Sequence, residues 1–247
     1  LLILRSIHIL CFYKTVFIMI GLERVHHSWK PLLNTLNTDY FIHFFNEVLP
    51  NSPYHPKNNI LKVFEKPVYD IKVVILGQEP HYFPNKATGL AYAVDQSFLF
   101  TRELDHIYME CGSDFKELDT WGTLEHWQEQ GVFLLNTSLT VETMKPGSHK
   151  HYWEDFIKKV IYFIARVRPC IWLFWGEQQR FTANLPVKSC FYVNGYDDTS
   201  IKTLPANEDY NYVLNTCNPY ETNFLGCKHF NYTNIILQKI SKKTINW

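Results

Sequence analysis

Strand-like and helix-like segments alternate along the chain. Five short runs are almost continuously apolar and rich in β-branched or aromatic residues, which is the pattern of strands buried on both faces. The segments between them repeat apolar residues every three or four positions, which predicts helices, and Asn231 and Thr233 are candidate caps of the last one. The predicted strands are Ile71–Leu76, Val132–Leu135, Ile171–Trp175, Cys190–Val193 and Tyr212–Leu214, and the predicted helices are Tyr40–Val48, Glu103–Glu110, Leu124–Gln130, Trp153–Val167 and Asn231–Lys242.

Polar turns follow four of these runs. Strands that alternate with helices predict a mostly parallel sheet covered on both sides. In such a sheet, ligands usually bind beyond the carboxyl ends of the strands. We therefore expect the chemistry in the turns Gly77–Tyr82, Asn136–Leu139, Gly176–Gln178 and Cys217–Tyr220, which should meet at one edge.

The composition indicates one folded domain and does not point to a particular binding partner. The chain has 247 residues, of which 46% are hydrophobic and 19% charged, so it can bury one sizeable core. Its 24 basic and 24 acidic residues balance, which does not indicate a nucleic-acid binder but leaves room for a local basic face. The six cysteines have no metal-ligand spacing, and no metal site is expected.

The amino-terminal segment, residues 1–22, is treated apart from the fold. It is apolar, but Arg5, His8 and Lys14 interrupt it, and charges are costly at the centre of a membrane span. The first methionine is Met19, so the preferred interpretation of this segment is translated upstream sequence. A targeting peptide is the second interpretation and a membrane anchor the third. The folded domain is expected over residues 23–247.

Short motifs occur along the chain in a fixed order. The motifs are Gly77-Gln78-Glu79-Pro80, Gly89-Leu90-Ala91-Tyr92, Gly131–Val141 (GVFLLNTSLTV), Ser148-His149 with Trp153, Leu173–Gly176 (LFWG), Val213–Pro219 (VLNTCNP) and Gly226–Phe230 (GCKHF). A glycine and a carboxylate after a buried strand are weak evidence alone, because an ordinary strand end has the same pattern. The order of the whole set, over about residues 28–247, is not generic, and together the motifs resemble the uracil-DNA glycosylase family.

The resemblance implies a fold, an activity and a setting. It implies a three-layer α/β/α sandwich with a central, mostly parallel four-stranded sheet, acting as a monomer without metal or cofactor. Its activity would be hydrolysis of the N-glycosidic bond of uracil in DNA, in base-excision repair, after the nucleotide is flipped out of the helix. The LLNTSLTV string and the terminal INW favour a herpesvirus-like viral member. A nuclear location follows from that, with mitochondrial targeting by residues 1–22 left open.

By the same resemblance, four residues would bind the base. Tyr92 stands at the stacking aromatic of the family, and Gln78 and His81 lie in the loop that activates water. Asn136 stands at the asparagine that reads the base. Its amide can accept from uracil N3–H and donate to O4, a pairing that cytosine opposes. A core tyrosine and an asparagine that caps a strand end are the structural alternatives.

Four positions depart from the family motifs. Glu79 replaces an aspartate, and its extra methylene moves the carboxylate by about 1 Å, which can cost ~10²-fold in rate. Asn218 replaces a histidine that donates to uracil O2, a role that an amide N–H can also fill. His81 and Tyr82 exchange the order of the family's Tyr-His pair, so the wall that excludes the methyl group of thymine differs. Glu79 and Asn218 are the predicted catalytic residues.

The surface expected to face DNA departs further. Glu103 stands where the family has a serine that contacts phosphate, and a carboxylate there repels the backbone. No leucine follows Pro219, the loop from Asn218 to Cys227 is short, and Asn194–Asp209 is an apparent insertion. The predicted DNA contacts are Ser148, His149, Pro219 and Tyr220.

Three functions remain open on the sequence alone. The first is a uracil-DNA glycosylase with reduced or altered activity that uses Glu79, Asn218, Asn136 and Tyr92. The second is a catalytically inactive homologue that binds DNA or acts as a scaffold for a replication protein. The third is a glycosylase for another modified base, which His81 suggests. All three have DNA, single- or double-stranded, as a partner, and none involves a membrane.

Overall fold

The computed structural model describes residues 21–36, 39–98, 101–112, 122–186, 190–193, 201 and 203–247. Nearly all of the predicted extension over residues 1–22 and about half of the apparent insertion over residues 194–209 lie outside these ranges. Among the described helices, none is both long and apolar enough to cross a membrane.

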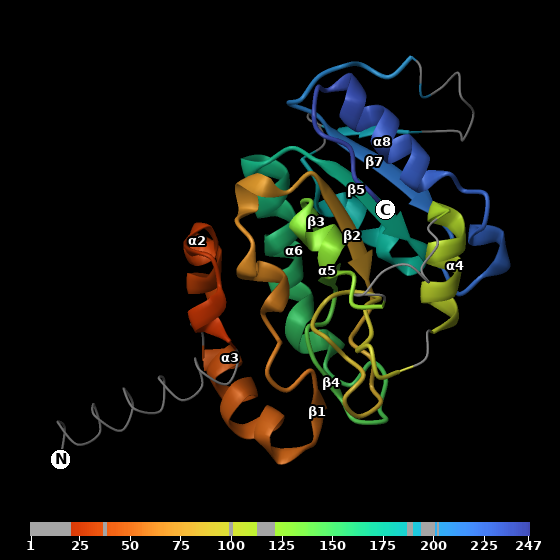
Figure 1. Cartoon of the computed structure of the whole chain (residues 1–247). Helices are drawn as coiled ribbons and strands as arrows, with labels where there is room; N and C mark the ends of the chain where they lie inside the picture. Colours follow the sequence, from red (N-terminus) through yellow and green to blue (C-terminus); the bar gives the residue numbers. More distant parts are fainter. Residues whose placement is uncertain are drawn as a thin grey trace.

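A five-stranded parallel sheet forms the centre of the molecule (Figure 1). The strand order is β3-β2-β5-β7-β6, and each of the four pairings is parallel. The expectation of four strands was wrong by one, because the short β6 adds a partly exposed edge to β7. The strands are β2 (Val73–Gly77), β3 (Val132–Asn136), β5 (Ile171–Trp175), β6 (Cys190–Tyr192) and β7 (Asn211–Thr216).

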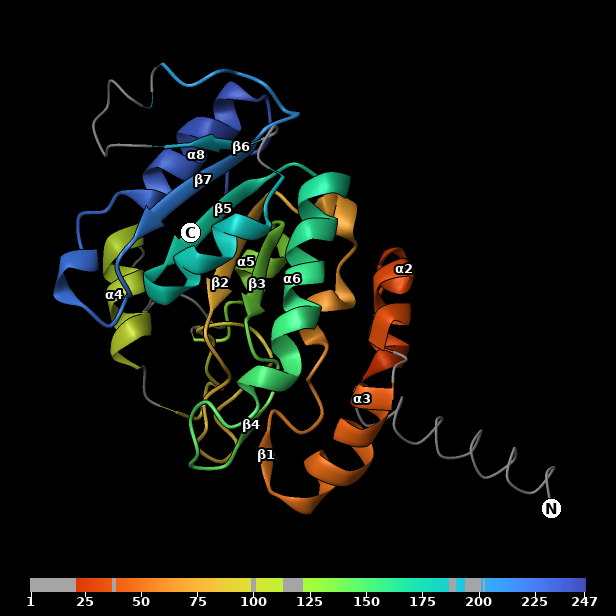
Figure 2. The same ribbon diagram turned by 180° about the vertical axis from the view of Figure 1, so that it is seen from behind.

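Helices cover both faces of this sheet, which confirms the three-layer α/β/α fold. The long α6 lies against one face and α4, α5 and α8 lie on the other, as the two opposite views show (Figures 1 and 2). The α-helices are α2 (Lys30–Leu33), α3 (Asp39–His43), α4 (Arg102–Cys111), α5 (Glu125–Glu129), α6 (Lys150–Val167) and α8 (His229–Lys239). A π-helical turn, Phe44–Val48, continues α3, and 3-10 turns cover Leu22–Arg24, His27–Trp29, Asn34–Leu36, Leu49–Asn51, Lys62–Glu65, Val68–Asp70, Gly176–Asn184 and Thr222–Phe224.

The start of α8 differs from the prediction. The helix begins at His229, directly after Lys228, whose φ of 57° is left-handed. Asn231 and Thr233 are therefore inside the helix, and the prediction that they cap it was wrong. The capping acceptor comes instead from α4, where the Glu110 carboxylate accepts from the backbone N–H of Lys228 at 2.6 Å. Such a cap cannot be found by local sequence signals.

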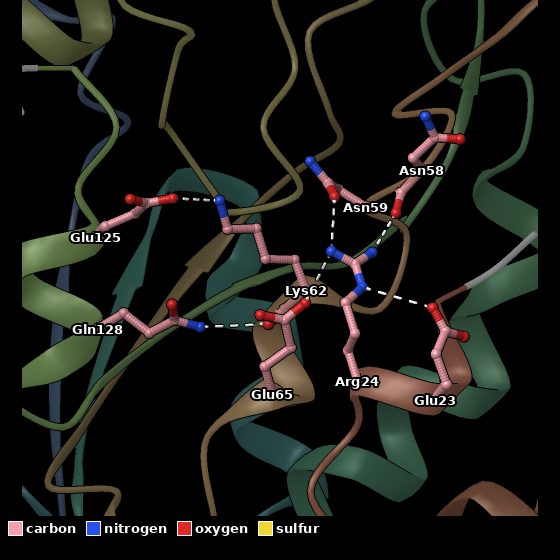
Figure 3. Close-up of polar contacts among 8 residues, drawn as sticks. All are labelled: Glu23, Arg24, Asn58, Asn59, Lys62, Glu65, Glu125 and Gln128. Carbon is pink, nitrogen blue, oxygen red and sulfur yellow. Dashed lines mark hydrogen bonds and ion pairs between the residues drawn. The ribbon is translucent and has the colours of Figure 1, made fainter. Parts of the chain in front are cut away.

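A polar network holds the segment over residues 58–65 (Figure 3). Arg24 Nη1 donates to Asn59 Oδ1 at 3.2 Å, and the Lys62 ammonium pairs with the Glu125 carboxylate. A side chain at Gly89, whose φ is 95°, would collide with the carbonyl oxygen of Asn59. Glycine is thus required where the Tyr92 loop crosses this segment.

A candidate active site at the carboxyl edge of the sheet

The site lies where the strand order reverses. β2 pairs with β3 on one side and with β5 on the other, and ligands bind at such switch points beyond the carboxyl ends of the strands. The register sets Gly77 opposite Asn136 and Trp175 opposite Thr216. The parallel register thus confirms that the four predicted turns share one edge of the sheet.

Asn136 ends β3 as a buried amide with an unused acceptor. Its side chain is 4% exposed, and Oδ1 has no hydrogen-bond partner among the described residues. Gly77 makes room for it, since a Cβ at that position would lie 2.5 Å from this oxygen. An unpaired buried acceptor is costly, so it is a feature that requires an explanation. A ligand with an N–H group would supply the missing donor.

Tyr92 provides an aromatic ring at the end of the neighbouring strand β2. Its φ of 63° is unusual for a residue with a side chain, and such backbone strain often marks a functional site. The phenol donates to the Leu76 carbonyl at 3.3 Å, and the ring lies 5.4 Å from that of Trp175. Burial, with the Glu103 carboxylate adding to it, raises the pKa of Tyr92, so the phenol stays neutral.

Glu79 is held by the loop before α6. Its Oε2 accepts from the backbone N–H of Gly147 at 2.7 Å. Burial raises the pKa of Glu79, while the Gly147 bond and the Lys150 ammonium act in the opposite direction. The carboxylate is therefore oriented, and it gains its proton at a higher pH than an exposed glutamate does.

Two further loop residues flank Glu79. Burial, with the Lys86 ammonium adding to it, lowers the pKa of His81 to about 4, and a bond to the Tyr92 backbone acts in the opposite direction. The imidazole is therefore neutral at pH 7. The Gln78 side chain is exposed, whereas the backbone carbonyl of Gln78 accepts from Ser138 N–H and Thr137 Oγ1–H, both at 2.9 Å.

Asn218 lies in the turn after β7, and the oxygen of its side-chain amide is already hydrogen-bonded within the turn. Its Oδ1 accepts from the backbone N–H of Tyr220 at 2.8 Å, which leaves the Nδ2 hydrogens as donors. Gly176, with φ of 61°, permits a close approach of this turn, because a Cβ there would lie 3.0 Å from the Asn218 Cβ. Asn218 can thus donate to a developing negative charge.

Comparisons with known proteins agree with these features. The family model described as the uracil DNA glycosylase superfamily matches residues 65–233. This chain belongs to that superfamily.

Proteins named uracil-DNA glycosylase resemble the chain over most of its length. One from Buchnera aphidicola (subsp. Acyrthosiphon pisum, strain Tuc7) is 36% identical, covering 89% of this chain and 97% of its own. One from Flavobacterium johnsoniae is 34% identical, covering 91% and 99%. Both are bacterial, so the expected herpesvirus-like affinity gains no support from them. The crystal structure of mimivirus uracil-DNA glycosylase, 19% identical, covers 97% of this chain and 92% of its own with a TM-score of 0.74, which shows the shared fold.

The four residues predicted from the motifs to contact DNA differ in how exposed they are to solvent. His149 is 3% exposed, its Nδ1 lies 3.0 Å from Thr140 Oγ1, and burial lowers its pKa. Ser148 Oγ accepts from the Glu142 N–H at 2.8 Å, and Pro219 is buried. Tyr220 is 54% exposed and is thus the most accessible of the four. Contact of these residues with DNA stays a prediction.

Sequence reasoning missed several residues that shape this glycosylase site. Trp175 was part of a motif but had no role until its ring was found beside Tyr92. Gly147 contacts Glu79 through its backbone N–H, and such a contact cannot be recognised from the residue type. Arg102, whose guanidinium lies 4.8 Å from the Tyr220 ring centroid, precedes Glu103 and returns a positive charge to the predicted DNA-facing surface. Within the described ranges, no group of three or more His, Cys, Asp or Glu residues could hold a metal ion.

Proposed function

We propose that this chain removes uracil from DNA by hydrolysing its N-glycosidic bond, the first step of base-excision repair. The observation that carries the proposal is the buried Asn136 amide, whose Oδ1 has no hydrogen-bond partner among the described residues. Uracil offers an N–H donor at N3 beside a carbonyl acceptor at O4, which fits one amide in a single orientation. The identity to proteins named uracil-DNA glycosylase supports the same substrate.

The reaction needs opposite charges stabilised on the two sides of the breaking bond. The sugar becomes cationic, and the proposed role of the Glu79 carboxylate, which the Gly147 N–H holds, is to orient water and to stabilise that charge. The departing uracil becomes anionic at O2, and Asn218 donates to it through Nδ2. The base must be flipped into the pocket first, at a cost of a few kcal/mol in stacking and pairing.

A cleavage assay tests the proposal directly. Single-stranded DNA with one uracil is incubated with the protein, and strand scission at abasic sites is measured after alkaline treatment. The proposal expects abasic product at the uracil position and much less in the matched strand with thymine. Product from the wild type no greater than that from the Glu79→Gln variant would refute it.

Asn218→Asp is expected to lower kcat by ~10²–10³-fold, because it removes one donor to the developing oxyanion. Aspartate keeps an acceptor for the Tyr220 N–H, so the turn is preserved while Nδ2 is lost. Asn218→His, which restores the donor of the family motif, is the matched control and should retain excision. Single-turnover rates on uracil-containing DNA measure both variants, and equal rates for wild type and Asn218→Asp would contradict the role.

His81→Tyr is expected to sharpen the selectivity of the enzyme for uracil over thymine. The neutral imidazole is smaller than a phenol ring, and a larger wall beside C5 of the base excludes a methyl group more strongly. A single methyl group is worth about 10–200-fold in discrimination. Product yields from strands with one uracil or one thymine opposite guanine check this, and an unchanged ratio would argue against His81 as the selecting residue.

The other functions left open by the sequence are weaker candidates. A catalytically inactive scaffold would not need an unsatisfied base-reading amide, and relatives named as glycosylases favour the enzyme. That the proposed enzyme acts as a monomer stays a prediction of the family resemblance. Binding to a replication protein and location in a nucleus or mitochondrion stay predictions, which co-purification and microscopy of a tagged chain would test.

A further inference from the structure

One face of α4 contacts both ends of the loop over residues 218–228. Arg102, His106 and Glu110 follow one another at four-residue spacing and so share this face. His106 Nδ1 lies 2.7 Å from the Pro219 carbonyl oxygen at the start of the loop. At its end, the Glu110 carboxylate accepts from the backbone N–H of both Gly226 and Lys228.

The other contacts of the loop near Asn218 are mostly local. Asn218 Oδ1 accepts from the Tyr220 N–H, and the backbone N–H of Asn218 donates to Glu221 Oε1 at 3.3 Å. The backbone carbonyl of Asn218 accepts from the Glu221 N–H at 2.9 Å. These bonds shape the turn, and β7 and the close approach of Gly176 hold its start. The bond from His106 adds a restraint from outside the loop, because it joins the residue next to Asn218 to a helix on the face of the sheet.

We propose that His106 is a positioning residue: its N–H bond to Pro219 sets the place of the Asn218 amide against the leaving base, while Glu110 anchors the far end of the loop. The inference rests on the proposed function of Asn218. The His106 side chain is buried, with 9% exposed, so water competes little for the Pro219 carbonyl. A carbonyl only accepts, so the hydrogen is on Nδ1.

Two substitutions separate this role from packing. In asparagine, Nδ2 stands close to the place of the histidine Nδ1, whereas in glutamine the amide nitrogen lies one bond further out. His106→Asn therefore keeps a donor for Pro219, and His106→Gln loses it while keeping a larger, polar side chain. A role in packing alone would be served better by glutamine.

Single-turnover and steady-state kinetics on single-stranded uracil DNA test the proposal. We expect His106→Gln to lower kcat by ~10²-fold, the cost of a misplacement of about 1 Å, with KM much less affected. His106→Asn should retain most of the activity. In an Asn218→Ala background, the cost of His106→Gln should largely disappear, because the residue acts through Asn218. An equal cost in both backgrounds, or equal loss in both His106 variants, would overturn the inference.

Hydrogen exchange keeps this test separate from that of the function itself. The amides of residues 218–228 should exchange faster in His106→Gln than in wild type or His106→Asn, with the core of the sheet unchanged. If the wild type excises no uracil, the proposed function fails, and the loop exchange still decides whether α4 holds the loop. Unaltered exchange in His106→Gln would refute the contact as a restraint.

Discussion

Replacing Glu79 by glutamine should lower kcat on uracil-containing DNA by ~10²–10⁴-fold, the usual contribution of a general base or a charge of this kind. The two side chains have the same length, and a glutamine oxygen can still accept from the Gly147 N–H. The substitution thus removes the negative charge and leaves the loop in place. Single-turnover rates under enzyme excess measure the chemical step, with thermal unfolding as a check on the fold.

The pH profile gives this prediction a second, independent measurement. The ionised carboxylate is the active form, and burial raises the pKa of Glu79 above its ordinary value. The rate should therefore fall as the pH is lowered through that raised pKa, and it should reach its full value at pH values above that pKa. Glu79→Gln should lose this acid limb, whereas Glu79→Asp, which keeps a carboxylate, should retain one. A wild-type acid limb that survives in Glu79→Gln would assign the titration to another group.

The sheet could be predicted from the sequence because its strands are buried on both faces. Continuous apolar runs such as Ile171–Trp175 match strands of the structure with small shifts at their ends. β6 was visible as a run but is only partly buried, and the family resemblance gave a sheet without it. The start of α8 could not be predicted, because its capping carboxylate, Glu110, stands 118 positions earlier in the chain.

The candidate site, like the fold, could be predicted from the sequence only in part. Motifs located Asn136 and Tyr92, because their spacing from the strand ends is fixed by the chain itself. What holds each side chain came only from the structure, since the partners are far away in sequence: Gly147 lies 68 positions after Glu79, and Pro219 lies 113 positions after His106. The buried ring of His149 shows the limit of a motif, which marks a residue as part of the site but does not say which way it faces.

Gly77→Ala should lower kcat/KM on uracil DNA by ~10²-fold or more, because displacements of about 1 Å in a base-reading group have effects of that size. A Cβ at position 77 would lie 2.5 Å from Asn136 Oδ1 and 2.8 Å from Ala91 Cβ. Both groups must move, and the Asn136 oxygen has no hydrogen bond among the described residues to hold it in place. Overpacking of this kind should cost about 1–3 kcal/mol of folding stability.

A matched glycine separates the effect on the site from the effect on the fold. Gly112, at the end of α4, has φ of 70° and nothing within 4 Å of an added Cβ, so Gly112→Ala strains only the backbone. That strain should cost roughly 1–2 kcal/mol, close to the stability loss in Gly77→Ala, with activity retained. The double variant Gly77→Ala with Asn136→Ala should be no less active than Asn136→Ala alone, because the amide to be displaced is already gone. Additive losses would show that Gly77 acts on the reaction by a route other than Asn136.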